Sequence, residues 1–265
     1  MTRDGHSATY EVRNGIIRFR SHFGPLNARL LNQPAEALAE KLLALQIGGA
    51  ARKSGSTDKA EAARLLQSEW DSKWNARTPA RWINRPPPAE LAEAVAAGWL
   101  PRSGRVVDLG CGTAEIAAWF ASRGYQATGI DIAQAAVDRA AARHGDLSKS
   151  MEFIAVDLCS HALPGRQFDI LVDRGCLHQI PPNLVPDYVR NVRSIAAPGA
   201  KLMLFSKAFR DGNRFGDPEE VREQTDWVRE TFAGHFDLDR AVPVYLNPGK
   251  RQDPQPGMAF WLSRA

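Results

Sequence analysis

The chain has 265 residues, which is enough for one large domain or for one domain with an appendage. Its composition, 44% hydrophobic and 24% charged, is ordinary for a globular protein, and no apolar run approaches the roughly 20 residues that a membrane helix needs. The net charge of +4 comes from residues 1–57, which hold eight Lys or Arg against four Asp or Glu, so the remainder is neutral. Proteins that bind nucleic acid usually concentrate basic residues on one face. We therefore expect no membrane partner, and a nucleic acid partner is not favoured.

The N-terminal segment and the cysteines bear on the compartment. Residues 1–7 are polar, so the sequence predicts no signal peptide. Cys111, Cys159 and Cys176 have neither paired nor metal-ligand spacing. We therefore expect a cytoplasmic protein without a metal site.

The first strands of the chain form a predicted hairpin. Tyr10–Arg13 and Ile16–Arg20 are two short β-type runs. Asn14-Gly15 between them supplies the positive φ angles of a type I′ turn. The sequence therefore predicts two antiparallel strands joined by a two-residue loop.

A helix and a linker are predicted to complete this N-terminal extension. Gly24-Pro25 is expected to end the strand pattern, and the leucines within residues 34–46 predict a helix. Residues 48–57, rich in Gly, Ser and Lys, predict a linker. We assign residues 1–57 to a hairpin–helix extension and residues 58–265 to the main domain. The extension has three open roles: a cover over a substrate, support for a homodimer, or a passive cap on a monomer.

The main domain begins with helices and continues as an alternating strand–helix series. Asp58–Trp74 is a predicted helix with Leu65, Leu66 and Trp70 on one side, and a second helix is predicted over Pro88–Trp99. From Arg105 onward strands and helices alternate, which predicts an α/β fold with a doubly wound, mostly parallel sheet.

The most informative stretch is the glycine-bearing turn VVDLGCGTA over residues 106–114, followed by GID over residues 129–131. A buried strand, a glycine turn, a helix and a second strand ending in an acid build a nucleotide pocket at the carboxyl edge of a sheet. A dinucleotide site has Gly-x-Gly-x-x-Gly, but here the third glycine is replaced by Glu115. S-adenosylmethionine carries no phosphate, and Asp108 suits its cationic groups. The spacing therefore favours S-adenosylmethionine over NAD.

These residues resemble motif I of the class I S-adenosylmethionine-dependent methyltransferases, with Ala114 where that family often has glycine. The resemblance continues in order through four further motifs: GID at 129–131, FIAVDL at 153–158, FDILVDRG at 168–175, and PGA at 198–200 as a turn before the strand KLMLF. It covers about residues 65–265. It implies the seven-stranded Rossmann-like methyltransferase fold, with the late strands Phe236–Val244 and Met258–Ser263 as its antiparallel edge hairpin.

The resemblance also implies a set of cofactor-binding residues. Asp131 would bind the ribose hydroxyls and Asp157 would lie beside the adenine. The full expected set for S-adenosylmethionine is Asp108, Gly110, Cys111, Gly112, Asp131, Ile132, Asp157, Leu158, Asp173 and Trp74.

The candidate catalytic residues follow the fourth strand of the series. Asp173 either lines the acceptor pocket or caps the next helix. Arg174 either contacts an anionic substrate or pairs with Asp131 or Asp157. His178 is a candidate general base, or a histidine hydrogen-bonded beneath the site. Cys176 lacks an evident partner that would lower its pKa, so nucleophilic catalysis by this thiol is not favoured.

A tryptophan-rich stretch narrows the resemblance to one branch of the family. WDSKW at 70–74 and TPARW at 78–82 resemble the N-terminal element of thiopurine and tellurite-resistance type methyltransferases, and DRGCLH at 173–178 resembles their Asp-Arg-x-x-Leu series. The resemblance implies that Trp70, Trp74 or Trp82 forms part of a lid. An amphipathic core helix is the alternative explanation of these tryptophans.

The sequence supports several functions. The leading hypothesis is methyl transfer from S-adenosylmethionine to an O, S or N atom of a small molecule, such as a secondary metabolite or thiol. The alternatives are an RNA or protein methyltransferase, in which the basic extension docks the substrate, and a non-catalytic S-adenosylmethionine-binding regulator. The Asn/Asp-Pro-Pro-aromatic motif of adenine, cytosine and glutamine methyltransferases is absent after Val172, which disfavours those acceptors.

Overall fold

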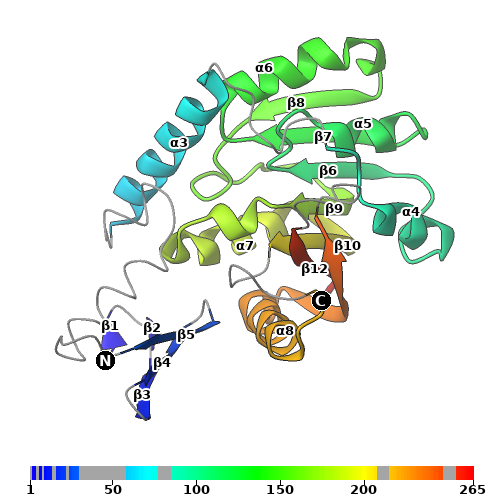
Figure 1. Ribbon diagram of the computed structural model, residues 1–265. Coiled ribbons are helices and arrows are strands. Elements are labelled where there is room, and N and C mark those ends of the chain that lie inside the picture. Colours follow the sequence, from blue (N-terminus) through cyan, green and yellow to red (C-terminus); the bar gives the residue numbers. More distant parts are fainter. Residues whose placement is uncertain are drawn as a thin grey trace.

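The structure is a computed structural model that describes residues 58–76, 85–207, 215–246 and 255–265, together with the backbone of short strands within residues 2–29. Seven strands form one sheet in the order β11-β12-β10-β9-β6-β7-β8 (Figure 1). The pairs from β10 to β8 are parallel, and β12 runs antiparallel between β10 and β11. The predicted doubly wound, mostly parallel sheet and its C-terminal hairpin are thus confirmed.

The elements of the main domain have the following bounds. The strands are β6 (Arg105–Leu109), β7 (Gln126–Asp131), β8 (Met151–Ala155), β9 (Phe168–Arg174), β10 (Ala196–Lys207), β11 (Phe236–Tyr245) and β12 (Pro256–Arg264). The α-helices are α3 (Lys59–Asn75), α4 (Ala89–Ala96), α5 (Glu115–Ala121), α6 (Gln134–Arg143), α7 (Val185–Ile195) and α8 (Pro218–Phe232), and the short 3-10 helices are η1 (Gly145–Leu147), η2 (Leu177–Gln179) and η3 (Pro182–Leu184).

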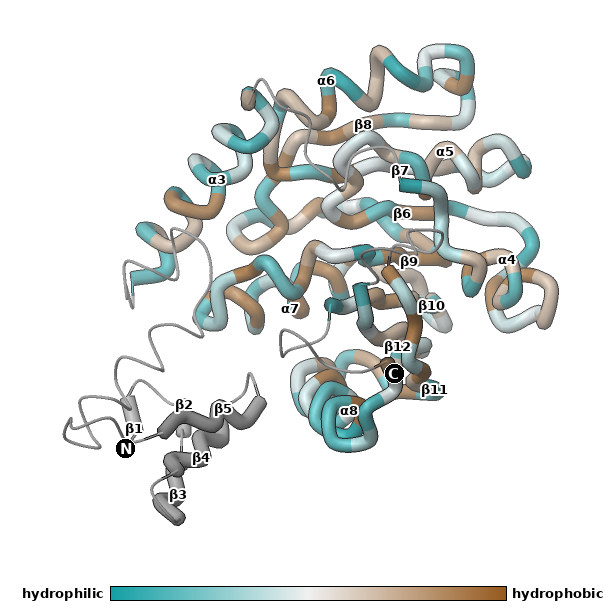
Figure 2. The backbone as a smooth tube through the Cα atoms, in the orientation of Figure 1, coloured by the Kyte–Doolittle hydropathy of each residue, from teal (hydrophilic) through white to brown (hydrophobic). Residues whose placement is uncertain are grey.

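Helices cover both faces of the sheet because its strands are apolar on both sides. Along β6, Val106 packs in one cluster with side chains of α4 and α5, whereas Val107 packs in another with α3, α7 and α8. Alternate residues of a strand point to opposite faces, which explains this division. Figure 2 shows hydrophilic and hydrophobic residues mixed along α3, α6 and α8, as expected of helices that bury one side. No helix in the described part of the chain is long and apolar enough to cross a membrane.

The N-terminal strands form small sheets of their own. β3 (Thr9–Arg13) and β4 (Ile16–Ser21) pair antiparallel with Arg13 opposite Ile16, as the predicted hairpin requires. β5 (Gly24–Arg29) adds a third strand, so the prediction that Gly24-Pro25 ends the strand pattern is wrong; proline is tolerated in such an edge strand. The two-residue strands β1 (Thr2–Arg3) and β2 (His6–Ser7) pair with each other. The turn Asn14-Gly15, the helix over 34–46 and the linker over 48–57 lie outside the described residues, and the division at residue 57 stays a prediction.

Two predicted boundaries in the main domain need correction. The helix predicted over Pro88–Trp99 ends at Ala96, because Gly98 adopts a φ of +73° and the chain turns back there. The turn predicted at Pro198–Ala200 lies inside β10 instead of before it, as a shift of register between Ala196 and Lys201. The predicted helix Asp58–Trp74 is confirmed as α3, with the Asp58 carboxylate accepting from the Ala60 backbone N–H.

Candidate active site

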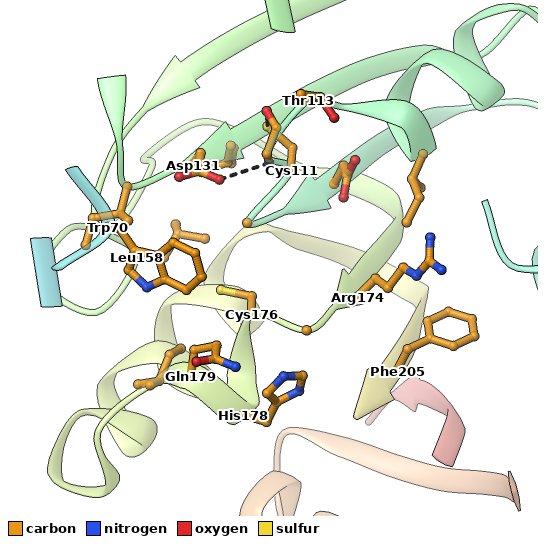
Figure 3. A pocket seen from close by; sticks show the side chains of 18 of the residues that line it. Trp70, Cys111, Thr113, Asp131, Leu158, Arg174, Cys176, His178, Gln179 and Phe205 are labelled. Atoms are coloured by element: carbon orange, nitrogen blue, oxygen red, sulfur yellow. Dashed lines mark hydrogen bonds between the residues drawn. The ribbon is translucent and has the colours of Figure 1, made fainter. Parts of the chain in front are cut away.

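A cavity of about 380 Å³ opens at the carboxyl edge of the parallel strands. Its walls come from α3, from the ends of β6, β7, β9 and β10, and from the segments that follow β8 and β11. In Figure 3, Asp131 and Cys111 lie on one side, Arg174, Phe205 and His178 on the other, and Cys176 between them. Of the cofactor-binding residues expected from sequence, nine line this cavity: Trp74, Asp108, Gly110, Cys111, Gly112, Asp131, Ile132, Asp157 and Leu158.

The turn between β6 and α5 forms one wall of the cavity. Gly110 has a φ of +67°, and a Cβ built on it would lie 2.8 Å from the Cβ of Cys176. Ala114, the residue before α5, is the only non-glycine residue with positive φ in the described chain, at +58°. The left-handed region costs an alanine about 1–2 kcal/mol, which explains why glycine is frequent at this position in the family that the turn resembles.

The close approach at Gly110 gives a testable prediction. We expect Gly110→Ala to lower the free energy of unfolding by about 2–4 kcal/mol, because the new methyl group adds a clash to the cost of the positive φ. Gly98→Ala is the matched control, since Gly98 has a φ of +73° with nothing within 4 Å of the added Cβ. Urea unfolding of both variants measures the difference. Equal losses would show that contact with Cys176 contributes nothing.

Asp131, at the end of β7, holds the turn in place. Its Oδ2 accepts from the Gly112 backbone N–H at 2.9 Å and its Oδ1 accepts from the Ala133 N–H at 2.9 Å. Burial raises the pKa of this carboxyl, against the lowering effect of these backbone hydrogen bonds. Each carboxylate oxygen can accept more than one hydrogen bond, so Asp131 also has acceptor capacity for ligand hydroxyls.

Asp108 lies at the other end of the turn and is 3% exposed. Its Oδ2 accepts from the Ala117 N–H at 3.2 Å, at the beginning of α5. Burial raises its pKa to about 7; the hydrogen bond from Ala117 opposes this, and the negative charge of Asp131 adds to it. A carboxyl group in such a position ionises more readily when a cation binds beside it.

Asp157 lies in the loop after β8. Its Oδ1 accepts from the Cys159 N–H at 2.8 Å and its Oδ2 accepts from the Ser160 hydroxyl at 2.5 Å. Leu158 is buried, and Ile132, after β7, is partly buried against the same core. These residues give the β7–β8 end of the cavity an apolar surface beside an acid.

Helix α3 brings two of the predicted tryptophans to the cavity. Trp74 is 3% exposed and packs on Ala133 and Ala136, and its ring lies 3.2 Å from the position of a Cβ on Gly112. Its Nε1 is buried without a hydrogen-bond partner among the described residues. Trp70 also lines the cavity, whereas Trp82 lies outside the described residues.

Asp173 does not line the cavity, so the expectation that it contacts cofactor or acceptor is not met. It is 1% exposed, and its carboxylate accepts from the backbone N–H groups of Cys176 and Leu177 and from the Tyr188 hydroxyl, at 2.8–2.9 Å. Of the two roles considered from sequence, the cap on the following helix agrees with these hydrogen bonds: the carboxylate fixes the beginning of η2, whose residues His178 and Gln179 line the cavity.

Arg174 lines the cavity and does not make the ion pairs with Asp131 or Asp157 that were one of its two possible roles. Its Nη1 donates to the Pro86 carbonyl at 2.6 Å and its Nη2 to the Leu246 carbonyl at 2.8 Å, so Asp131 and Asp157 are not its partners. Burial, and after it the neighbouring charge of Arg85, lowers the pKa of Arg174 to about 10. The guanidinium thus links the segment before α4 to the end of β11.

His178 lies in η2, at the cavity wall. The Lys207 backbone N–H points to its Nδ1 at 3.4 Å, which assigns the proton of a neutral ring to Nε2. Cys176 also lines the cavity, and burial raises the pKa of its thiol and of the Cys111 thiol well above the usual value. Both sulfurs are therefore protonated near neutral pH, which agrees with the low expectation of a cysteine nucleophile.

Several residues that line the cavity were not predicted from sequence to be site residues. Arg85 precedes α4, Lys207 ends β10, and Leu246 and Gln255 flank the β11–β12 connection. None of them belongs to a motif. Only the strand order could have indicated such residues. The carboxyl ends of parallel strands meet at one edge of the sheet, so a residue that ends a strand, such as Lys207, is a candidate for the site.

Comparison with known proteins identifies the family. A profile described as a methyltransferase domain matches residues 106–199. The chain is 28% identical over 201 residues to a 2-heptyl-1-hydroxyquinolin-4(1H)-one methyltransferase of Mycobacteroides abscessus, an alignment that covers 71% of this chain and 86% of that protein. It is 24% identical over 193 residues to the thiopurine S-methyltransferase of Vibrio parahaemolyticus, covering 64% of this chain and 82% of that protein.

A solved structure shows the same fold. The 1,6-didemethyltoxoflavin-N1-methyltransferase of Burkholderia thailandensis, solved with 1,6-didemethyltoxoflavin and S-adenosylhomocysteine, is 17% identical with a TM-score of 0.53, covering 97% of this chain and 99% of that one. The matched profile spans the glycine turn, Asp131 and the β9 end that form the cavity. The chain is therefore an enzyme of the class I S-adenosylmethionine-dependent methyltransferases.

Proposed function

We propose that the chain transfers a methyl group from S-adenosylmethionine to an O, S or N atom of a small-molecule acceptor. The observation that carries this proposal is the cavity, which joins the glycine turn and its acids to a second half over the ends of β9 and β10. Its volume of about 380 Å³ lies in the range of small-molecule sites. Hydroxyquinolones, thiopurines and didemethyltoxoflavin, named in the relatives, are all small heterocycles.

The residues of the turn fit S-adenosylmethionine. Asp108 and Asp131 offer carboxylates to a ligand with cationic groups and ribose hydroxyls. Trp74 offers a buried Nε1–H that has no partner among the described residues, and Gly112 leaves open the space that a Cβ would fill beside this ring. A buried donor without a partner costs about 1–3 kcal/mol, which a ligand acceptor would recover.

The residues that line the cavity have distinct roles in the proposed reaction. S-adenosylmethionine, when bound, supplies an electrophilic methyl group on a sulfonium. Asp131 accepts hydrogen bonds from the ribose, Asp108 favours the cationic groups, and Trp74 with Leu158 excludes water from the β7–β8 side. His178 and Arg174 border the half in which the acceptor is held. Holding two reactants in line and free of water accounts for much of the rate enhancement in such transfers.

The substitution Trp74→Phe tests whether the unpaired Nε1–H of Trp74 binds the cofactor. We expect a cofactor affinity about 3–10-fold lower, because one hydrogen bond is lost, and a free energy of unfolding lowered by about 1 kcal/mol, because the smaller ring leaves a void at a buried site. Calorimetric titration with S-adenosylhomocysteine and urea unfolding measure the two effects. Trp119→Phe on α5, a residue that does not line the cavity, is the control. An unchanged affinity in Trp74→Phe would remove Trp74 from the cofactor site.

The proposed function is tested by following labelled methyl groups. The full chain is incubated with methyl-labelled S-adenosylmethionine and a panel of phenols, thiols and nitrogen heterocycles, and separately with total RNA and protein. Label in a small organic product supports the proposal. Label only in acid-precipitable RNA or protein indicates a macromolecular acceptor, and cofactor binding without any transfer indicates a regulator; either result contradicts the proposal.

A further inference from the structure

The cavity has two electrostatically different halves that follow the strand order of the sheet. Its described carboxylates all come from β6, β7, the loop after β8 and the beginning of α5: Asp108, Asp131, Asp157 and Glu115. Glu115 pairs with Arg143 at 2.6 Å. Lys73 of α3 is the cation on this side, and it pairs with Glu69 at 2.7 Å. This acidic half is the one assigned above to S-adenosylmethionine.

The other half lies over the ends of β9, β10 and β11 and is basic. Arg174 ends β9, Lys207 ends β10, and Arg85 approaches from the segment before α4. Among the described lining residues contributed by these segments there is no Asp or Glu. Among the described lining residues, the charged side chains therefore change sign between β6 and β9.

Neutral groups hold the Arg174 guanidinium at the cavity wall, next to Arg85. Arg174 donates to two backbone carbonyls, those of Pro86 and Leu246, and Arg85 Nη1 donates to the Gln255 side-chain carbonyl at 3.2 Å. The Leu246 N–H in turn donates to the Gln255 carbonyl at 2.9 Å. These bonds fix the position of the Arg174 guanidinium without neutralising its charge. Asp108 and Glu90 favour the Arg174 charge from a distance, and Arg85 opposes it.

The same half has an apolar wall. Phe205 and Leu246 are 1% and 6% exposed and line the cavity beside the arginines, and Ile180 lines it from the end of η2. Figure 3 shows Phe205 next to Arg174, across the pocket from Asp131. An aromatic ring and an aliphatic side chain beside fixed guanidinium groups match a ligand with a flat apolar body and a negative charge.

We propose that the acceptor is an anion with a ring-sized apolar body, an aromatic acid in the broad sense, which the basic half binds over the ends of β9, β10 and β11. This proposal rests on the proposed function, since it names the substrate class of that same site. A carboxylate could also come from the methionine part of the cofactor. The test therefore separates the two sources.

The test uses two probes of equal shape and different charge. The full chain is saturated with S-adenosylhomocysteine and titrated in a calorimeter with 4-hydroxybenzoate, an anion at pH 7.5, and with 4-hydroxybenzamide, which is neutral. We expect the anion to bind about tenfold more tightly or better, as one charge-assisted hydrogen bond implies. Arg85→Gln should abolish this preference while leaving benzamide affinity unchanged, and Arg85→Lys should keep most of it. Arg229→Gln on the exposed surface of α8 is the control.

Three results would overturn the proposal. Equal affinity for the two probes, or no binding of either at millimolar concentration, contradicts an anion-selective acceptor half. Loss of S-adenosylhomocysteine affinity in Arg85→Gln with an unchanged probe preference assigns the charge to the cofactor. The proposed function is contradicted by a different result. If the anion binds more tightly but no acceptor receives labelled methyl, the ligand class is supported and methyl transfer is contradicted.

Discussion

Replacing Asp173 by alanine is expected to lower the free energy of unfolding by about 3–5 kcal/mol. Its carboxylate accepts three hydrogen bonds, from two backbone N–H groups of η2 and from the Tyr188 hydroxyl, at a site that is 1% exposed. Alanine leaves all three donors buried without this partner. Urea unfolding of Asp173→Ala measures the loss, with Asp138→Ala on α6 as a control.

A second variant separates stability from catalysis at this position. Tyr188→Phe removes one of the three donors and should cost about 1 kcal/mol. If Asp173 is structural, the activity of both variants should follow the fraction of folded protein. A fully stable Asp173→Ala protein without activity would instead make Asp173 catalytic.

Replacing Asp108 by asparagine is expected to raise stability and weaken cofactor binding at the same time. Burial raises the pKa of Asp108 to about 7, above the ordinary value of 3.8. The folded protein therefore binds more protons than the unfolded chain between about pH 4 and 7, so this carboxyl makes stability fall as pH rises through that window. Asparagine removes the cost of a buried charge and retains an acceptor for the Ala117 N–H.

The Asp108 prediction is measured by thermal unfolding at two pH values. At pH 8 Asp108→Asn should melt above the wild type, by roughly 2–4 °C for each kcal/mol gained, and near pH 5 the two proteins should approach each other. S-adenosylmethionine should stabilise the variant less, because the attraction to its cationic groups is lost; we expect about tenfold weaker binding. A variant that melts no higher at pH 8, or binds the cofactor as tightly as the wild type, contradicts the account of Asp108.

The glycine turn and its acids were predictable because local sequence determines them. Positive φ at Gly110, and a strand end at Asp131 beside a parallel neighbour, follow from residue type and strand order. The role of Asp173 was not decided by sequence. A residue near a strand end can point into the cavity or under the next helix, and only the position of η2 and Tyr188 determines which.

The basic half of the cavity was not predictable for a different reason. Arg85, Lys207 and Gln255 lie far apart in the chain and become neighbours through the sheet order and the antiparallel insertion of β12. Local patterns carry no information on such contacts. The ends of strands also depend on the strands beside them. Pro198-Gly199 resembles a turn in sequence, yet β10 continues through these residues with a shift of register against β9.

The most direct test of S-adenosylmethionine binding at this cavity is a calorimetric titration of the full chain and of Asp131→Ala. We predict one binding site in the wild type and an affinity about 10–100-fold lower in the variant, since Asp131 holds both the ribose and the Gly112 turn. Asp138→Ala, which changes an exposed acid of α6, should bind like the wild type. No binding to the wild type, or equal affinity in Asp131→Ala, would contradict this assignment.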